Sequence, residues 1–259
     1  MLLSVHPHAR ALAQHFERAY SYLTGLLQVS LDIRLALLSQ QDWPLYVQSP
    51  IYGAAIYDYP RRTIVNGAEY TAFWEPILAR LQTDAPALLE HLRAVYATPD
   101  GSIDLNPHVE LWMIHDLGHA CHLHHAYWFP RKWLMELFAT LCLFTYIADQ
   151  EPDLLLRAET FMLVLHDLPA QMVDYPRLAE FEERYNTLPL DNYLWFSGHF
   201  MQLAHDLYAQ FGSAALVRMW QMFVLGKIAD VSDLELKQRM IRTDPALAAM
   251  LIALPEQYD

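Results

Sequence analysis

The chain has few of the residues that build disulfide scaffolds or flexible linkers. Its 259 residues include only two cysteines, Cys121 and Cys142, and eight glycines. Two cysteines are too few for the disulfide framework of a small secreted protein, and their scarcity favours a reducing compartment. Internal repeats, low-complexity tracts and Gly/Ser-rich linkers are also missing. We therefore predict a single domain over residues 1–259.

Basic residues and long hydrophobic runs are scarce as well. Lys and Arg number 17 against 30 Asp and Glu, and the net charge of −13 disfavours nucleic acid and anionic membranes as partners. The most apolar window, residues 133–148, is shorter than the roughly 20 residues that cross a bilayer. The apolar stretch at the N-terminus is too short for a secretory signal. We expect a cytoplasmic protein with no nucleic-acid and no membrane partner.

Hydrophobic residues make up 54% of the chain, which indicates a globular protein with a large core. Residues 30–75 carry short β-branched or aromatic runs separated by Pro and Gly, so they predict a small sheet. Residues 31–38, LDIRLALL, are consistent with either a strand or a helix. An amphipathic helix is expected before the sheet, over residues 8–28.

The remainder of the chain has helical patterns, and residues 106–150 hold two helices in succession. Asn106 as N-cap and Pro107 at the first helical position predict a helix that runs through Ala126. The apolar residues 132–148 predict a buried helix after it.

Residues 151–259 form a C-terminal helical part. One of its helices is predicted to be capped by Asp191 or Asn192 and to end at Gly212. The fold class that follows is α+β, mainly helical, with a small N-terminal sheet.

Two histidines on the first of these helices are candidate metal ligands. His115 and His119 are four residues apart in the run IHDLGHA, so their imidazoles project from one helix face. The apolar neighbours of the pair indicate a buried helix, and buried imidazoles need partners. His108 and His122 fall on the same stripe, and either is a candidate for a further ligand or for a donor to one.

Glu136 is the third candidate ligand. It lies in WLMELFATLCLFTYIA, a run that is apolar on every face, and a carboxylate there is costly to bury unless it is paired or bound to a metal. A salt bridge to Lys132 is the alternative. If the second helix folds back on the first, two imidazoles and one carboxylate meet with an open position for water, as in catalytic zinc sites.

The combination resembles the gluzincin zinc metallopeptidases. In that family an HExxH helix is followed by a helix whose Glu is the third ligand, often in a W-x-x-E-x-x-A setting, which Trp133, Glu136 and Ala139 match. The resemblance implies a zincin-like domain, a zinc ion (Zn2+) on His115, His119 and Glu136, and a peptide or small amide substrate. It also implies that the edge of the small sheet binds extended peptide.

The same resemblance assigns catalytic roles. Asp116 stands where the family has a Glu as general base, and a shorter side chain at this position predicts weak or degenerate activity. The family also uses a Tyr or His from a later helix to stabilise the oxyanion. Tyr193 and His199 are the candidates for that role.

Two other functions are consistent with the sequence. The string HDLGHA also resembles the metal-binding core of HD-domain phosphohydrolases, in which His115 and Asp116 would bind the ion with an earlier His and a later Asp, here His91 and Asp167. The strand-rich residues 31–68 and the embedded Glu136 argue against it. A non-catalytic metal-binding or scaffold protein on a zincin frame is the third hypothesis, favoured by Asp116.

Overall fold

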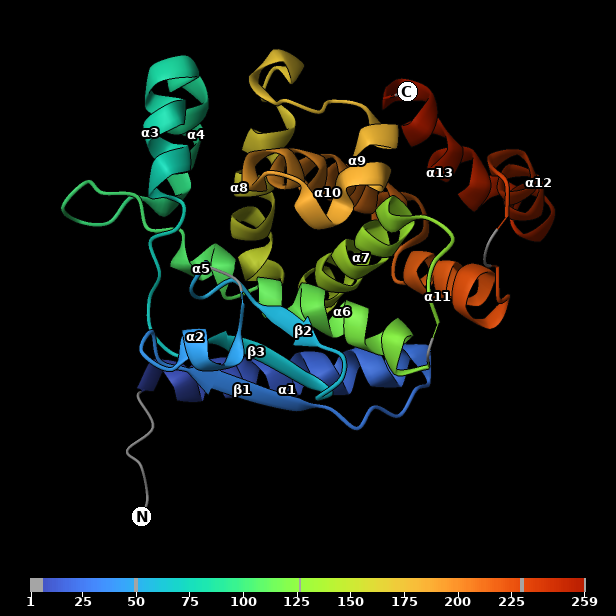
Figure 1. Ribbon diagram of the computed structural model, residues 1–259, viewed down its shortest axis with the longest axis horizontal. Helices are drawn as coiled ribbons and strands as arrows, with labels where there is room; N and C mark the ends of the chain where they lie inside the picture. The colour runs from blue at the N-terminus through green and yellow to red at the C-terminus, as the bar shows by residue number, and fades with distance from the viewer. Residues whose placement is uncertain (1–6, 49–50, 126, 229–230, 259) are drawn as a thin grey trace. The chain divides into compact units, whose positions relative to one another are not determined.

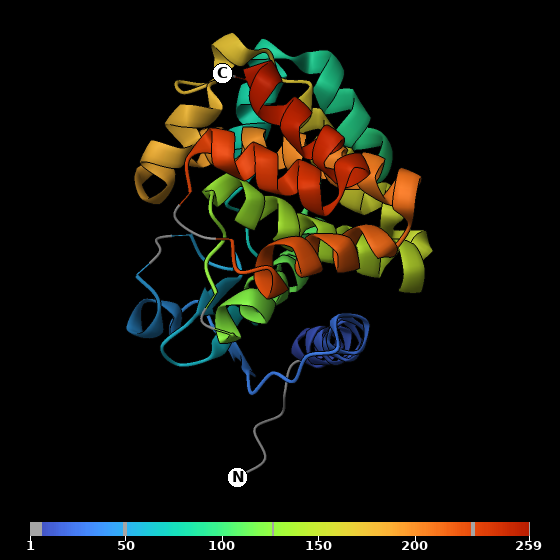
Figure 2. The same cartoon turned by 90° about the vertical axis from the view of Figure 1, so that its right-hand side faces the viewer.

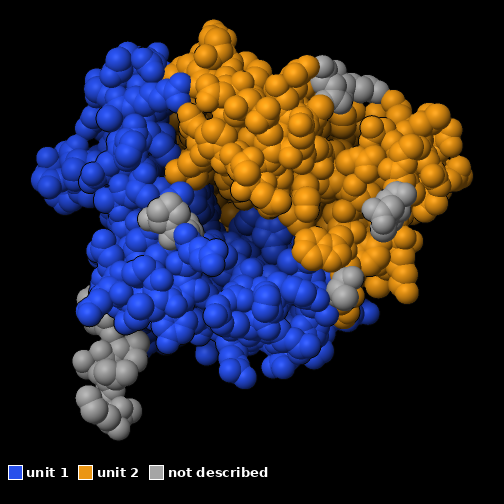
Figure 3. All heavy atoms as spheres, viewed as in Figure 1, with its two compact units in different colours: residues 1–124 blue, residues 125–259 orange. Residues whose placement is uncertain are grey.

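A computed structural model describes residues 7–48, 51–125, 127–228 and 231–258. The chain divides into two compact units, residues 1–124 and residues 125–259, which are coloured separately in Figure 3. The fold is mainly helical with a small sheet, which confirms the α+β class expected from the sequence. No helix in the described part of the chain is long and apolar enough to span a membrane.

Unit 1 contains the predicted sheet. Its strands in the described residues are β1 (Arg34–Leu38), β2 (Ile56–Asp58) and β3 (Thr63–Gly67), in the order β1-β3-β2 (Figure 1). β1 runs parallel to β3, and β2 runs antiparallel to it. The second part of the ambiguous run at residues 31–38 is therefore a strand, Arg34–Leu38, because β3 offers it a continuous parallel ladder.

Two helices cover this sheet. The N-terminal helix α1 (Pro7–Leu27) confirms the helix expected over residues 8–28, and it contacts β1 and α6 (Trp112–His124). α6 in turn contacts β2 and β3. Ala19, Leu23, Ile114 and Leu117 have no exposed surface, and their spacings of four and three residues place each pair on one helix face. The sheet thus fixes the helix that carries the candidate histidines.

The helix predicted to start at Asn106 differs from the expectation. A short helix α5 (Asn106–Val109) has Leu105 as its N-cap, and the chain turns before α6 begins at Trp112. The amide of Asn106 does not cap, because its Oδ1 accepts the Thr71 N–H at 2.9 Å and its Nδ2 donates to Asp104 at 2.7 Å. Ala126, the predicted end, lies outside the described residues. The remaining helices of unit 1 are α2 (Trp43–Tyr46), α3 (Glu75–Asp84) and α4 (Pro86–Tyr96).

Unit 2 is helical and is built around α7 (Lys132–Gln150), which confirms the predicted buried helix. Every residue from 133 to 147 is buried. α7 contacts α8 (Leu155–His166), α9 (Leu178–Arg184), α10 (Leu190–Phe211) and α11 (Ala214–Trp220). Because neighbours pack on all its sides, the helix is apolar all round.

The last helices of the chain are α12 (Asp233–Thr243) and α13 (Pro245–Tyr258), which lie beside one another (Figure 2). Short turns complete the unit: η1 (Pro152–Leu154), η2 (Ala170–Met172), η3 (Tyr185–Thr187) and the π-helical turn η4 (Gln221–Leu225).

α10 starts two or three residues earlier than predicted, with Pro189 rather than Asp191 or Asn192 as N-cap. Asn192 instead accepts the N–H of Asp174 and donates to the carbonyl of Tyr175, so it holds the preceding loop. The predicted C-terminal end is confirmed, since Gly212 follows Phe211 with φ of 61°.

Candidate metal centre

In unit 1, α6 presents His115 and His119 as a pair. The centroids of their rings are 4.8 Å apart, with the ring planes at 80°. One ring nitrogen of each lies within 4.8 Å of the other's. Two nitrogens bound to one zinc at 2.0–2.1 Å are about 3.4 Å apart in tetrahedral geometry. Small side-chain rotations therefore suffice for the pair to share an ion.

His122 supports this pair. It is fully buried, and its Nε2 lies 3.3 Å from Nδ1 of His119. In the tautomer in which Nδ1 of His119 donates to Nε2 of His122, Nε2 of His119 carries the lone pair that a metal ligand needs. An imidazole whose second nitrogen is held by a neighbour is the usual arrangement for a metal-binding histidine. His108 has another contact, since its Nε2 accepts the indole N–H of Trp112 at 3.1 Å.

Asp116, the predicted general base, contacts the sheet. Its Oδ1 accepts the backbone N–H of Tyr57 in the edge strand β2, at 2.7 Å. This bond orients the carboxylate and also occupies an N–H of the edge that the sequence resemblance assigned to peptide binding.

In unit 2, Glu136 is only 1% exposed. The hydroxyl of Tyr185 donates to its Oε1 in a short hydrogen bond, and the hydroxyl of Tyr193 donates to its Oε2 at 2.7 Å. The ammonium of Lys132, the predicted salt-bridge alternative, lies over the rings of Trp128 and Tyr185, 5.4 Å from each centroid. Glu136 is thus a buried carboxylate oriented by two tyrosines.

This arrangement is compatible with metal binding. A carboxylate oxygen has two lone pairs, so one hydrogen bond to each oxygen leaves acceptor capacity on both. Hydrogen bonds of this kind orient metal-binding carboxylates. His115, His119 and Glu136 are each of a type that binds divalent ions, and each offers one ligand atom.

The two predicted oxyanion donors lie in different places. Tyr193 contacts Glu136, whereas His199, six residues later, points about 120° away around α10. Nδ1 of His199 is 2.9 Å from the hydroxyl of Tyr258, and its ring lies 4.6 Å from that of His166. Burial is the main cause that lowers the pKa of His199, to about 3, and the nearby His166 adds to it. His199 is therefore neutral at pH 7.

Tyr185 was not predicted from the sequence. It follows α9 directly and lies 49 residues from Glu136, so no local pattern connects the two. The only sequence signal was indirect, because a carboxylate in an apolar helix requires donors from elsewhere.

The two residues that would complete an HD-type site with His115 and Asp116 are exposed. His91 is exposed on α4, and Asp167 is exposed after α8, where it pairs with Nδ1 of His166 at 2.9 Å. Neither shares the buried surroundings of Glu136. No family model, no curated protein and no solved structure matches the chain at a significant level.

Proposed function

We propose that His115, His119 and Glu136 bind one zinc ion and that the protein is a zinc-dependent hydrolase of a peptide or related amide bond. The observation that carries this proposal is the buried Glu136 carboxylate, held by two tyrosine hydroxyls on a helix that is otherwise apolar.

This set of ligands is typical of a catalytic zinc site rather than of a structural one. Structural zinc sites have four protein ligands, whereas two imidazoles and one carboxylate leave a position for water. Zinc in such a site lowers the pKa of its bound water to about 7 and polarises a carbonyl. The order of the ligands also supports the resemblance to gluzincins, and with it a zincin-like frame.

The protein's own groups would orient the reactants and move the proton. Asp116, one residue after His115, is the proposed base, and the Tyr57 N–H holds its carboxylate in one orientation. Tyr193 is better suited to position Glu136 than to stabilise an oxyanion, because its hydroxyl already donates to that carboxylate. The ring of His199 lies beside those of His166 and Tyr258, about 120° around α10 from Tyr193, so we assign it no part in the reaction.

A non-catalytic metal protein is the second candidate. The specific observation in its favour is the bond from the Tyr57 N–H to Asp116, because a carboxylate engaged by a strand is a weaker base. The phosphohydrolase interpretation has less support, since both His91 and Asp167 are exposed.

Two isosteric substitutions test the proposal. Glu136→Gln should lose most of the bound zinc, while Asp116→Asn should keep the zinc and lose hydrolysis of a peptide library. Zinc content would be measured by mass spectrometry on the purified variants, with circular dichroism to verify folding. Asp153→Asn, at an exposed position, is the matched control.

The reverse pattern, with zinc lost from Asp116→Asn and kept by Glu136→Gln, would favour the phosphohydrolase. Zinc bound by the natural chain without hydrolysis of any peptide would favour the non-catalytic protein.

A further inference from the structure

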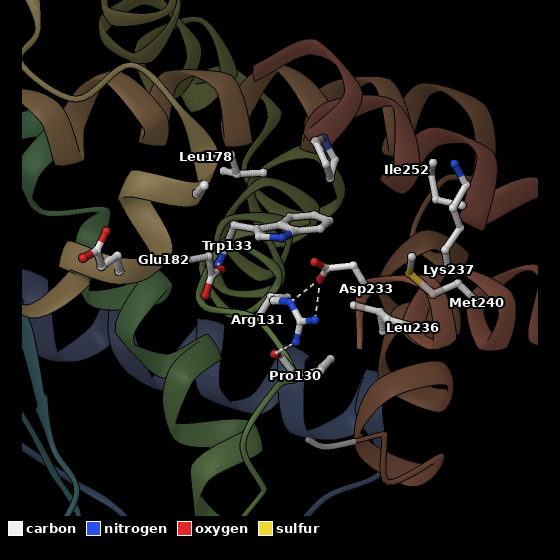
Figure 4. Close-up of a pocket in the computed structure, with 13 residues that line it drawn as sticks. Pro130, Arg131, Trp133, Leu178, Glu182, Asp233, Leu236, Lys237, Met240 and Ile252 are labelled. Carbon is white, nitrogen blue, oxygen red and sulfur yellow. Dashed lines mark hydrogen bonds and ion pairs between the residues drawn. The ribbon is translucent and has the colours of Figure 1, made fainter. Parts of the chain in front are cut away.

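Unit 2 contains an open pocket that none of the preceding assignments uses. Its volume is about 640 Å³, and residues at the start of α7 and from α9, α12 and α13 line it (Figure 4). Sites for small organic molecules usually measure about 300–1,000 Å³. The pocket is therefore large enough for a ligand of one or two rings.

The floor of the pocket is apolar and includes the indole of Trp133, which is 4% exposed. Figure 4 shows the indole of Trp133 in the middle of the pocket, with Leu178, Leu236 and Met240 around it. Aromatic rings pack well against an indole in offset or edge-on arrangements, which add to the gain from burying apolar area. The floor thus favours an aromatic ligand over a flexible aliphatic one.

The guanidinium of Arg131 cannot readily serve an anionic ligand. It forms an ion pair with Asp233, where Nε donates at 2.9 Å. Its other nitrogens donate to the carbonyls of Pro130 and Val231, at 2.6 and 2.9 Å. An anion would have to displace these partners.

The remaining charges favour a cation. Besides the Arg131–Asp233 ion pair, the charged residues that line the pocket are two carboxylates, Glu182 and Glu183, and one cation, Lys237. The carboxylate of Glu182 accepts two backbone N–H groups at the start of α7. Its Oε2 accepts the N–H of Lys132 at 2.9 Å, and its Oε1 accepts the N–H of Trp133 at 2.8 Å. Burial is the main cause that raises the pKa of Glu182, against these bonds and the charges of Arg131 and Lys132, so a further positive group beside it would be favourable.

We propose that this pocket binds a small arylalkylamine, with its ring against Trp133 and its protonated amine toward Glu182 and Glu183. The proposal needs no metal ion and does not depend on hydrolysis. Trp133 is three residues before Glu136 on α7, so the bound ring would lie within one helical turn of the proposed zinc ligand.

The test uses two probes that share an indole ring and differ in charge. Tryptamine and indole-3-propionate would be titrated into the full chain by calorimetry, after metal has been removed with a chelator. We expect tryptamine to bind about tenfold more tightly, the value of one favourable ion pair of about 1.4 kcal/mol. Equal affinities, tighter binding of the acid, or no binding of tryptamine would overturn the proposal.

Variants locate the binding. Ala179→Phe fills the pocket from an exposed position of α9 and should abolish binding, while Ala209→Phe, exposed on α10 outside the pocket, should not. Lys237→Glu keeps the pocket open and should tighten tryptamine binding severalfold, which provides a test if Ala179→Phe does not fold. Unchanged affinity in Lys237→Glu would place the binding elsewhere and overturn the assignment.

Discussion

Glu136 shows how one residue depends on hydroxyl donors from other segments. Ionised carboxylates in a protein interior are costly unless hydrogen bonds and charges compensate them. The hydroxyls of Tyr185 and Tyr193 supply such bonds from two later segments of unit 2. Removing one hydroxyl leaves a buried acceptor with a missing partner, which costs more than the net value of the hydrogen bond itself.

Tyr193→Phe tests this dependence. We expect zinc affinity to fall about 10- to 100-fold, because partners of this kind orient the ligand. We also expect the free energy of unfolding to fall by about 1–3 kcal/mol. Zinc titration against a competing chelator and urea unfolding measure the two effects. Tyr46→Phe, at an exposed position, should change neither. Natural zinc affinity in Tyr193→Phe would contradict the assigned role.

His199 predicts a dependence of stability on pH. Its pKa is lowered from 6.5 to about 3 in the folded protein, so the unfolded chain binds the proton first as the pH falls. Stability is therefore lost below about pH 6.5 and the loss levels off near pH 3. Between pH 7 and pH 5 this residue alone accounts for about 2 kcal/mol.

His199→Gln should flatten that dependence. Urea unfolding at pH 7 and at pH 5 gives the loss of stability for the natural chain and the variant. We expect the variant to lose about 2 kcal/mol less over this interval. Gln210→Asn, at an exposed and non-titratable position on the same helix, is the control and should leave the slope unchanged. Equal slopes for the natural chain and His199→Gln would show that His199 titrates normally.

At the scale of elements, α8 and α10 approach each other closely at Gly198. A Cβ at this position would lie 2.5 Å from the backbone N of His166 and 2.6 Å from the carbonyl oxygen of Met162. Both atoms belong to the backbone of α8, so the clash can be relieved only if the helices move apart. The glycine thus sets the distance between two helices that flank α7.

Two Gly→Ala substitutions separate this effect from helix propensity. Gly198→Ala should lower the free energy of unfolding by about 1–3 kcal/mol or more through overpacking. Gly25→Ala, in α1, has nothing within 4 Å of the new Cβ and should raise it by up to about 1 kcal/mol. Urea unfolding gives the free energy of unfolding of both variants and so separates overpacking from helix propensity. A stabilised Gly198→Ala would mean that the two helices separate at little cost.

At the scale of the whole molecule, a zinc ion on the proposed ligands would bind the folded chain in preference to the unfolded one. Zinc should therefore stabilise the complete chain, by about 3 kcal/mol at a free concentration 100 times its Kd. Thermal unfolding with and without zinc measures this stabilisation. Glu136→Gln should lose most of it, whereas His91→Gln should keep it. Loss of the stabilisation in His91→Gln would favour the phosphohydrolase site instead.

Local patterns in the chain were sufficient to predict several features. The four-residue spacing of His115 and His119 places the two rings together because the period of an α-helix depends on local backbone geometry alone. The apolar residues around Glu136 predicted its burial for the same reason, since a helix that is apolar all round must be interior. The strands within residues 30–75 followed from β-branched runs between turn residues.

Contacts between distant residues could be decided only in three dimensions. Asn106 and Asn192 have the side chain of a helix cap, but tertiary partners in loops compete for their amides. The tyrosines on Glu136 come from 49 and 57 residues away, and His199 meets Tyr258 from 59. Periodicity describes how a segment presents its own side chains and carries no information on which segment they meet. That choice is made when the helices pack.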